Sequence, residues 1–335
     1  MPSPNPSAVV LLGVQRFEPN LAAAVAGLGL AEKGRIATIT AGWQERESED
    51  EELAAHLAQE TVNLRLHARG EEVFEEDPEL RTAHRERQDA LRHRQDFYRI
   101  RLEHELDAER VIQKRVAPPD IVAEQAEASL NAIRELDSWH LSHCSRLHGE
   151  FETKWQLARR PSVARHREEL AKIVDGCVAI AIAGGHVATL INRLALFGIG
   201  DLLRGRAVLA WSGGAMAISE RVVLFHDDPP QGPGVSELLD AGLGLVPGVV
   251  VLPQPEERLQ LGQTDRVQSL VRRFAPALSL AFPARSHVTY RAGKFSEARG
   301  VIELCADGSN RPFAPAGRAA PAARTAPAAR RRSKS

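Results

Sequence analysis

An apolar strand that ends on a single serine constrains this chain more than any other feature. Residues 207–220 read AVLAWSGGAMAISE: a strand-forming run, then Ser212, two glycines and a helix-forming run. A serine on a sharp strand-to-helix turn projects its hydroxyl from the sheet, and only very small neighbours fit such a turn. The pattern predicts a nucleophile elbow, in which Trp211 is unusually bulky. A tight α/β turn without chemistry is the alternative interpretation.

Strands and helices alternate on both sides of this turn. A strand at Val9–Leu12, a helix from about Asn20 to Leu28 and a strand at Arg35–Thr40 indicate a parallel sheet with a crossover helix. After residue 171 the alternation resumes, and we expect one helix from Pro255 to Ala275. The chain is therefore predicted to be an α/β protein, with a mainly parallel sheet flanked by helices. Ligands gather at the carboxyl ends of parallel strands, so we expect the loop residues Trp43 and Gln44 to face the site. Alternatively, Trp43 is only a packing residue.

Residues 71–170 have a different composition. They are dense in charge and carry apolar residues at helical spacing, such as Tyr98, Leu102 and Leu106. This pattern predicts a large helical insertion, folded as an antiparallel hairpin or small bundle. We expect residues 1–70 to form the N-terminal part of the α/β domain and residues 171–310 its C-terminal part, which carries the elbow. Residues 311–335 are predicted to be a disordered basic Ala/Pro/Arg tail.

The charge balance argues against a nucleic-acid binder. Seven of the 43 Lys and Arg residues lie from Arg311 onward, where there is no acidic residue, so residues 1–310 hold 36 basic and 44 acidic side chains. No apolar run approaches the length of a membrane span, and the N-terminus lacks the pattern of a signal peptide. Three cysteines form no disulfide framework. We expect a cytoplasmic protein with no membrane partner.

Several of these segments follow one another in a familiar order. A strand ending in AGGH at residues 183–186 precedes a helix with LINRL, then the Ser212 turn, then LGLVPGVVV at residues 243–251. This succession resembles the cyanophycinase and peptidase E family of serine peptidases, whose members share a class I glutamine amidotransferase-like fold. Those proteins show a Gly-Gly-Asn turn, a GTSAGA elbow and a GLGLLPG stretch. The likeness covers residues 172–290 well and the first 66 residues by topology only.

The resemblance implies roles for the residues that match. Ser212 falls at the nucleophile, and Gly185 and Gly213 fall where the oxyanion is held. Asp227 falls where peptidase E-like members keep an acid. The implied activity is attack of the serine on the carbonyl of a peptide or small amide substrate.

The chain departs from the family at the catalytic base. The family histidine follows the LLPG strand, and Gln254 stands at that place, where we expect it to bind the substrate or the oxyanion. The family glutamate position falls near Ala284, and His186 replaces the asparagine of the double-glycine turn. Since a serine needs a base to take its proton, another histidine substitutes or the hydrolytic machinery is absent. His186 and His226, which precedes Asp227, are the main candidates for the base.

Two further groups of histidines are open to two interpretations. His287 begins a terminal strand, and its side chain is either the catalytic base or an ordinary polar side chain of that strand. His140, Cys144 and His148 share one helical face, with His143 beside them, which suits a metal ion or a polar packing face. We expect no metal and no cofactor, since no glycine-rich nucleotide motif is present either.

Two functions remain open: a serine hydrolase, or an inactive relative that binds ligands in its pocket and partners, including a second copy, through the helical insertion.

Overall fold

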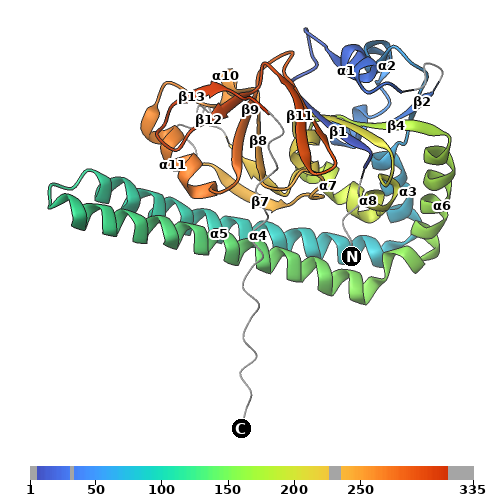
Figure 1. Ribbon diagram of the computed structural model, residues 1–335. Helices are drawn as coiled ribbons and strands as arrows, with labels where there is room; N and C mark the ends of the chain where they lie inside the picture. Colours follow the sequence, from blue (N-terminus) through green and yellow to red (C-terminus); the bar gives the residue numbers. More distant parts are fainter. Residues whose placement is uncertain (1–5, 31–33, 226–234, 316–335) are drawn as a thin grey trace.

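The computed structural model describes residues 6–30, 34–225 and 235–315 (Figure 1). A seven-stranded sheet forms the centre, in the order β11-β10-β1-β5-β4-β2-β3. Five neighbouring strands run parallel: β1 (Ala8–Leu12), β2 (Arg35–Ile39), β3 (Thr61–Asn63), β4 (Cys177–Ile182) and β5 (Ala207–Trp211). β10 (His287–Arg291) and β11 (Lys294–Arg299) extend the sheet in antiparallel orientation. The predicted α/β fold with a mainly parallel sheet is confirmed.

Helices cover both faces of this sheet. One face packs against α1 (Leu21–Gly27) and α2 (Glu51–Leu57). The opposite face packs against α6 (Pro161–Asp175), α7 (Val187–Leu196), α8 (Ile199–Leu202) and α9 (Gly213–Ile218). The bulk of Trp211 is explained by strand alternation, because its side chain is buried on the α1–α2 face with Leu12 and Leu209. Shorter segments complete this part: η1 (Ala41–Arg46), α3 (Leu66–Glu76) and η2 (Leu157–Arg159).

The C-terminal strands form two further sheets. A four-stranded sheet has the order β13-β12-β9-β8, from β8 (Val249–Pro253), β9 (Leu278–Phe282), β12 (Ile302–Leu304) and β13 (Asn310–Pro312). A two-stranded sheet joins β6 (Arg221–Leu224) to β7 (Glu237–Ala241). The strand that leads to Gln254 is therefore in a different sheet from the strand that leads to Ser212, although α9 packs against both β5 and β8.

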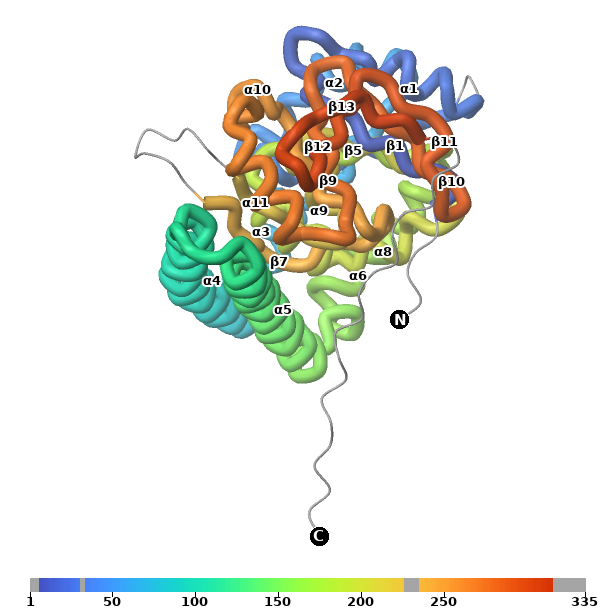
Figure 2. Tube along the Cα trace, turned by 60° about the vertical axis from the view of Figure 1, so that its left-hand side comes forward, coloured from blue at the N-terminus to red at the C-terminus, as the bar shows by residue number. Residues whose placement is uncertain are grey.

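Two long antiparallel helices lie along this body, α4 (Pro78–Gln113) and α5 (Pro119–Trp155) (Figures 1 and 2). Each begins on a proline, which suits a first helical turn, and the Asp77 side chain accepts a hydrogen bond from the Leu80 backbone N–H. With 36 and 37 residues, each helix is about 54 Å long at about 1.5 Å per residue. The predicted helical insertion has this hairpin as its main part.

The hairpin is joined to the body by polar contacts on β7. Gln95 and Arg99 of α4 each donate to the carboxylate of Glu237, at 2.8 Å. The Tyr98 hydroxyl lies 3.2 Å from the Leu238 backbone nitrogen, and the His148 imidazole lies 2.7 Å from an Asp240 carboxylate oxygen. The charged sequence of the hairpin thus serves docking as well as solvation.

The helix expected from Pro255 to Ala275 was wrong as a single element. The structure has a short α10 (Pro255–Arg258) and a separate α11 (Thr264–Phe274). Leu259 has an extended backbone, and Leu259 and Leu261 pack against the core between the two helices. Burial of these leucines and the low helix propensity of Gly262 account for the break. In the part of the chain that the structure describes, no helix combines the length and apolar character needed to cross a membrane.

Candidate active site

Ser212 lies at the junction of β5 and α9. Its backbone has φ 50° and ψ −127°, and its side chain is partly exposed. This conformation is sparsely populated for any residue that carries a Cβ atom, and it costs of order 1–3 kcal/mol. The chain holds it because β5 is fixed in the centre of the sheet, while Gly213 to Ile218 are all buried in α9. The serine is therefore the residue that absorbs the sharp change of direction.

The glycine turn after β4 lies directly against this serine. A Cβ atom added to Gly184 would lie 2.7 Å from the Ser212 Cβ and 3.0 Å from the Gly213 nitrogen. One added to Gly213 would lie 3.0 Å from the Gly185 oxygen. Gly185 has φ 106°, a conformation that glycine adopts readily. Glycine at these three positions allows the two backbone segments to touch.

Two backbone amides at this contact have no hydrogen-bond acceptor within the described residues. Within the described residues, the Gly185 N–H donates no hydrogen bond. The Gly213 N–H is the first of α9, where no acceptor exists inside the helix. The Gly185 nitrogen lies 3.5 Å from the place of a Cβ atom on Gly213. Unpaired N–H groups beside a hydroxyl are the chemistry that stabilises an oxyanion.

The loop after β2 packs on the other side of the same glycine turn. The His186 backbone N–H donates to the Gly42 oxygen at 2.7 Å, and a Cβ atom on Gly185 would lie 3.0 Å from the Trp43 ring. Trp43 is a partly buried packing residue, whereas Gln44 donates from Nε2 to the Thr189 hydroxyl at 3.2 Å. Thr189 was not among the site residues predicted from the sequence. Its spacing of three residues from His186, at the start of α7, is the only signal that pointed to it.

His186 is exposed and is the N-cap of α7. Its Nδ1 accepts from the Thr189 backbone N–H at 3.2 Å and lies 2.8 Å from the Thr189 hydroxyl oxygen. Among the residues that the structure describes, neither His186 nor any other side chain makes a hydrogen bond with the Ser212 hydroxyl. The structure thus brings Ser212, Gly185 and Gly213 together with the backbone of His186. The catalytic and oxyanion roles of these residues stay predictions.

Gln254 caps β8 in the second sheet. It adopts a left-handed conformation, its backbone N–H donates to the Phe282 oxygen at 3.2 Å, and its side-chain amide donates to Glu257 at 3.1 Å. A carboxamide has no basic lone pair, so this residue is unsuited to take a proton from a serine. Its predicted contact with substrate stays a prediction.

The remaining candidate residues are His226, Asp227 and His287. His226 and Asp227 lie outside the described residues. His287 starts β10 opposite Leu12, which in turn pairs with Trp211, and its Nε2 lies 3.5 Å from a Glu297 oxygen. His287 is therefore two strands from β5 at the same edge of the sheet, about 10 Å away at the usual strand spacing.

The histidine-rich face of α5 is divided among several partners. His140 stacks on Tyr98 with ring centroids 4.1 Å apart, and its Nε2 is 3.7 Å from the Cys144 sulfur. His148 contacts Asp240, and His143 lies against the backbone of its own helix. Across residues 6–30, 34–225 and 235–315, no group of three or more His, Cys, Asp or Glu residues is arranged to hold a metal ion. His140 thus packs within the hairpin and His148 joins the hairpin to β7, whereas the His143 contact is exposed.

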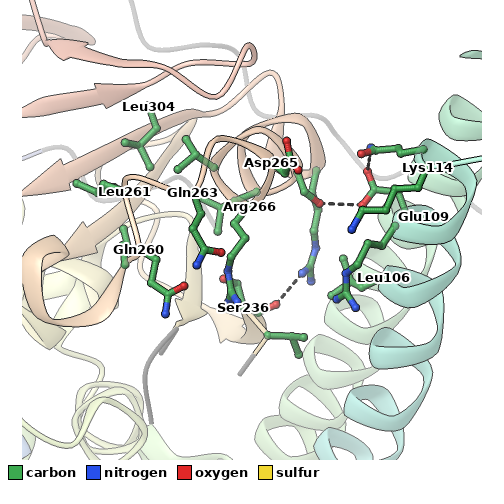
Figure 3. A pocket seen from close by; sticks show the side chains of 18 residues that line it. Leu106, Glu109, Lys114, Ser236, Gln260, Leu261, Gln263, Asp265, Arg266 and Leu304 are labelled. Atoms are coloured by element: carbon green, nitrogen blue, oxygen red, sulfur yellow. Dashed lines mark hydrogen bonds between the residues drawn. The ribbon is translucent and has the colours of Figure 1, made fainter. Parts of the chain in front are cut away.

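A pocket of about 420 Å³ lies between α4, α11 and the loop at residues 259–263 (Figure 3). None of the predicted site residues within the described ranges lines it. Glu109 on its wall accepts from Ser269 and Gln113, and Arg273 donates to the Ser236 oxygen. This pocket belongs to the seam between the hairpin and the body rather than to the edge of the sheet that carries Ser212.

Comparison with known proteins gives likenesses to solved structures only. No protein-family model matches the chain, and no curated protein matches it significantly. Among solved structures, a peptidase from an acI-B1 Actinobacterium is similar to this chain with a TM-score of 0.45 and 13% sequence identity. The alignment covers 92% of this chain and 97% of that chain.

Proposed function

We propose that this chain is a serine-type hydrolase of the cyanophycinase and peptidase E type, acting on a peptide or amide carbonyl with Ser212 as nucleophile. The observation that carries the proposal is the backbone of Ser212, with φ 50° and ψ −127° at a strand-to-helix turn. Strain of this kind persists where the surrounding structure maintains it, and such residues cluster at functional sites. The contact with Gly184 and Gly185 supports the same reading.

The chemistry follows from the groups at this contact. The Ser212 oxygen bonds to the carbonyl carbon, and the negative charge on the carbonyl oxygen is received by the N–H groups of Gly185 and Gly213. The serine proton passes to a base and then to the leaving amine as the carbon–nitrogen bond breaks. Water hydrolyses the acyl-enzyme in a second step and regenerates the hydroxyl.

The base for Ser212 is assigned to a histidine elsewhere in the chain, because Gln254 stands at the position of the family histidine. Gln254 is excluded by its chemistry, and His287 is two strands away. We propose His226 as the base with Asp227 as its acid, and His186 as the competing candidate. Replacing each histidine by alanine separates the two, because loss of the base lowers the reaction rate of Ser212 by about 10²–10⁴-fold.

The test is covalent labelling with an alkyl fluorophosphonate. The serine oxygen attacks phosphorus and fluoride leaves, so the reaction requires an activated hydroxyl. We expect stoichiometric labelling of the wild-type protein, none of Ser212→Ala, and unchanged labelling of Ser48→Ala, a matched exposed serine. Labelling that survives Ser212→Ala, or a wild-type protein that stays unlabelled from pH 6 to 9, rejects the hydrolase.

A second candidate function is partner binding through the α4–α5 hairpin. Seven large apolar side chains are exposed in the described part of the chain, and all but Phe17 belong to this hairpin: Phe97, Ile100, Val111, Val116, Ile121 and Trp139. Phe97 and Ile100 are three residues apart on α4, so they lie on one side of the helix and offer an apolar contact to another helix. We propose a second copy of the chain as the partner, forming a four-helix arrangement.

The oligomeric state tests this candidate. We expect the wild-type protein to have the mass of a dimer by light scattering, and the double variant Phe97→Ser, Ile100→Ser to have that of a monomer. Phe17→Ser, which replaces an exposed apolar residue outside the hairpin, is the control and keeps the dimer. A wild-type protein that is monomeric at 100 µM contradicts the dimer and leaves the hydrolase proposal unaffected.

A further inference from the structure

A second residue at this edge of the sheet has the same unusual backbone as Ser212. Gln44, in the loop after β2, has φ 58° and ψ −124°, against φ 50° and ψ −127° for Ser212. Their strands, β2 and β5, both pair with β4, so the two residues flank the Gly184–Gly185 turn. Two such residues on either side of one glycine turn indicate that Gln44, like Ser212, is held in place by its surroundings.

The side chain of Gln44 starts a short chain of hydrogen bonds that ends on His186. Gln44 Nε2 donates to the Thr189 hydroxyl oxygen at 3.2 Å, and this oxygen lies 2.8 Å from His186 Nδ1. A hydroxyl that accepts from Gln44 still has its own proton to donate to Nδ1. The Thr189 backbone N–H donates to the same nitrogen. Nδ1 is therefore an acceptor, and the neutral ring holds its proton on Nε2.

This arrangement leaves one donor and one acceptor without partners. The His186 Nε2–H and the Gln44 Oε1 make no hydrogen bond within the described residues, and both side chains reach the surface. Gln44 stands on the loop that packs against the Gly184–Gly185 turn, and His186 directly follows this turn. A peptide bond offers the complementary pair, because its oxygen accepts and its N–H donates.

We propose that Gln44 and His186 form a subsite for one amide unit of the substrate, beside Ser212, with Thr189 as the positioning residue. The inference rests on the proposed hydrolase and narrows its substrate to compounds with a second amide next to the one that is cleaved. His186 Nε2–H donates to the oxygen of that amide, and Gln44 Oε1 accepts from its N–H. A ring that carries its proton on Nε2 is a donor there and does not serve as the base for Ser212.

The tautomer of His186 is the first readout, and it requires no activity. At pH 8, two-dimensional ¹H–¹⁵N correlation of the imidazole nitrogens should show a protonated Nε2 and an unprotonated Nδ1. Thr189→Val removes the hydroxyl at nearly constant shape, and we expect the population with the proton on Nδ1 to rise. A wild-type ring with its proton on Nδ1 overturns the proposal.

Binding of an amide is the second readout. In the Ser212→Ala protein, titration with acetyl-trialanine amide should shift the His186 Nε2 resonance. Gln44→Ala should weaken this binding at least fivefold, while Gln125→Ala, an exposed glutamine on α5, should not. Equal binding by the Gln44→Ala and Gln125→Ala variants overturns the proposal, whether or not Ser212 proves reactive.

Reactivity links the subsite to the hydrolase. We compare two diphenyl phosphonates with the same reactive group, one with an acylamino substituent and one with an alkyl chain. The acylamino probe should label the wild-type protein at least tenfold faster than the alkyl probe. In the Gln44→Ala and Thr189→Val variants we expect the ratio of rates to fall towards one. An unchanged ratio rejects the subsite, whereas the absence of labelling by both probes, with amide binding retained, rejects the hydrolase alone.

Discussion

Arg273 of α11 and Asp137 of α5 form a doubly hydrogen-bonded ion pair in the buried contact between body and hairpin. Both nitrogen–oxygen distances are 2.7 Å, and both side chains are at most 5% exposed. The Tyr98 hydroxyl lies 2.7 Å from each of them. The neighbouring anionic carboxylate keeps the pKa of the Arg273 guanidinium raised despite the opposing effect of burial. All three helices of this contact therefore share one polar network.

Removing one member of this pair should strongly destabilise the protein. Arg273→Met leaves the Asp137 carboxylate buried without its partner, which costs about 3–5 kcal/mol. Arg272→Met is the matched control on the same helix, because Arg272 is partly exposed and lies 3.8 Å from Glu127, a contact worth less than about 1 kcal/mol. Urea unfolding measures both variants. Similar losses of unfolding free energy in the two variants would show that the buried ion pair contributes no more to stability than the exposed one.

The contact between Gly184 and Ser212 gives a prediction that couples stability to reactivity. In Gly184→Ala, the new methyl group would lie 2.7 Å from the Ser212 Cβ, so the turn must move. We expect a loss of about 1–3 kcal/mol from overpacking and a fall in phosphonate labelling of at least tenfold. Gly27→Ala is the control, since no atom lies within 4 Å of its added methyl group.

That control should be neutral or stabilising by up to about 1 kcal/mol, with full labelling. Labelling of Gly184→Ala at the wild-type rate would show that the close approach of the two loops is not needed for reactivity.

The sequence predicted the parts of the fold that depend on local pattern. Apolar runs identified β1, β2, β4 and β5, and the charged residues 71–170 indicated the hairpin, because side-chain periodicity reports which face of an element is buried. The small residues around Ser212 predicted the turn, because larger side chains would not fit in it. These features need no knowledge of distant partners.

The features that the sequence did not predict depend on distant contacts. The strand before Gln254 pairs with β9 in a second sheet. This pairing depends on tertiary packing and cannot be read from the sequence of the strand itself. Gln44 has a positive φ, although such a conformation is usually taken by glycine. No local sequence pattern therefore predicted its conformation. Nor did any pattern join Tyr98, Asp137 and Arg273, which are up to 175 residues apart.

The three cysteines should differ sharply in reactivity. Burial, with a smaller effect of the Asp240 carboxylate, raises the pKa of the Cys144 thiol to about 12, and burial also raises the pKa of Cys177. Cys305 is partly exposed. Because the thiolate is the reactive form, a disulfide reagent at pH 8 should modify Cys305 alone in the folded protein.

Urea should then expose the other two thiols. Cys305→Ser should abolish the modification without urea and leave two thiols with urea. Fast reaction of Cys144 in folded Cys305→Ser would mean that the packing between α5 and the body opens readily.

His84, on α4, should make the protein sensitive to acid. Its ring lies 4.8 Å from the Phe74 ring, and its Nε2 is buried with no hydrogen-bond partner in the described part of the chain. Burial, helped by the nearby Arg87 and Arg193 cations, lowers the pKa of His84 from 6.5 to about 3. Between these values the unfolded chain binds a proton that the folded protein does not. Stability is therefore unaffected above pH 6.5 and falls below it, by up to about 1.4 kcal/mol per pH unit.

His84→Leu should remove this part of the pH dependence. Between pH 7.5 and pH 5 only the last 1.5 pH units lie below 6.5, so the wild type should lose about 2 kcal/mol more unfolding free energy than the variant. His104→Leu, which replaces an exposed imidazole on the same helix, is the control and should keep the wild-type slope. Urea unfolding at the two pH values gives the comparison. Equal slopes for wild type and His84→Leu would mean that His84 takes up its proton in the folded state, and that its surroundings at the contact of α3 and α4 admit water.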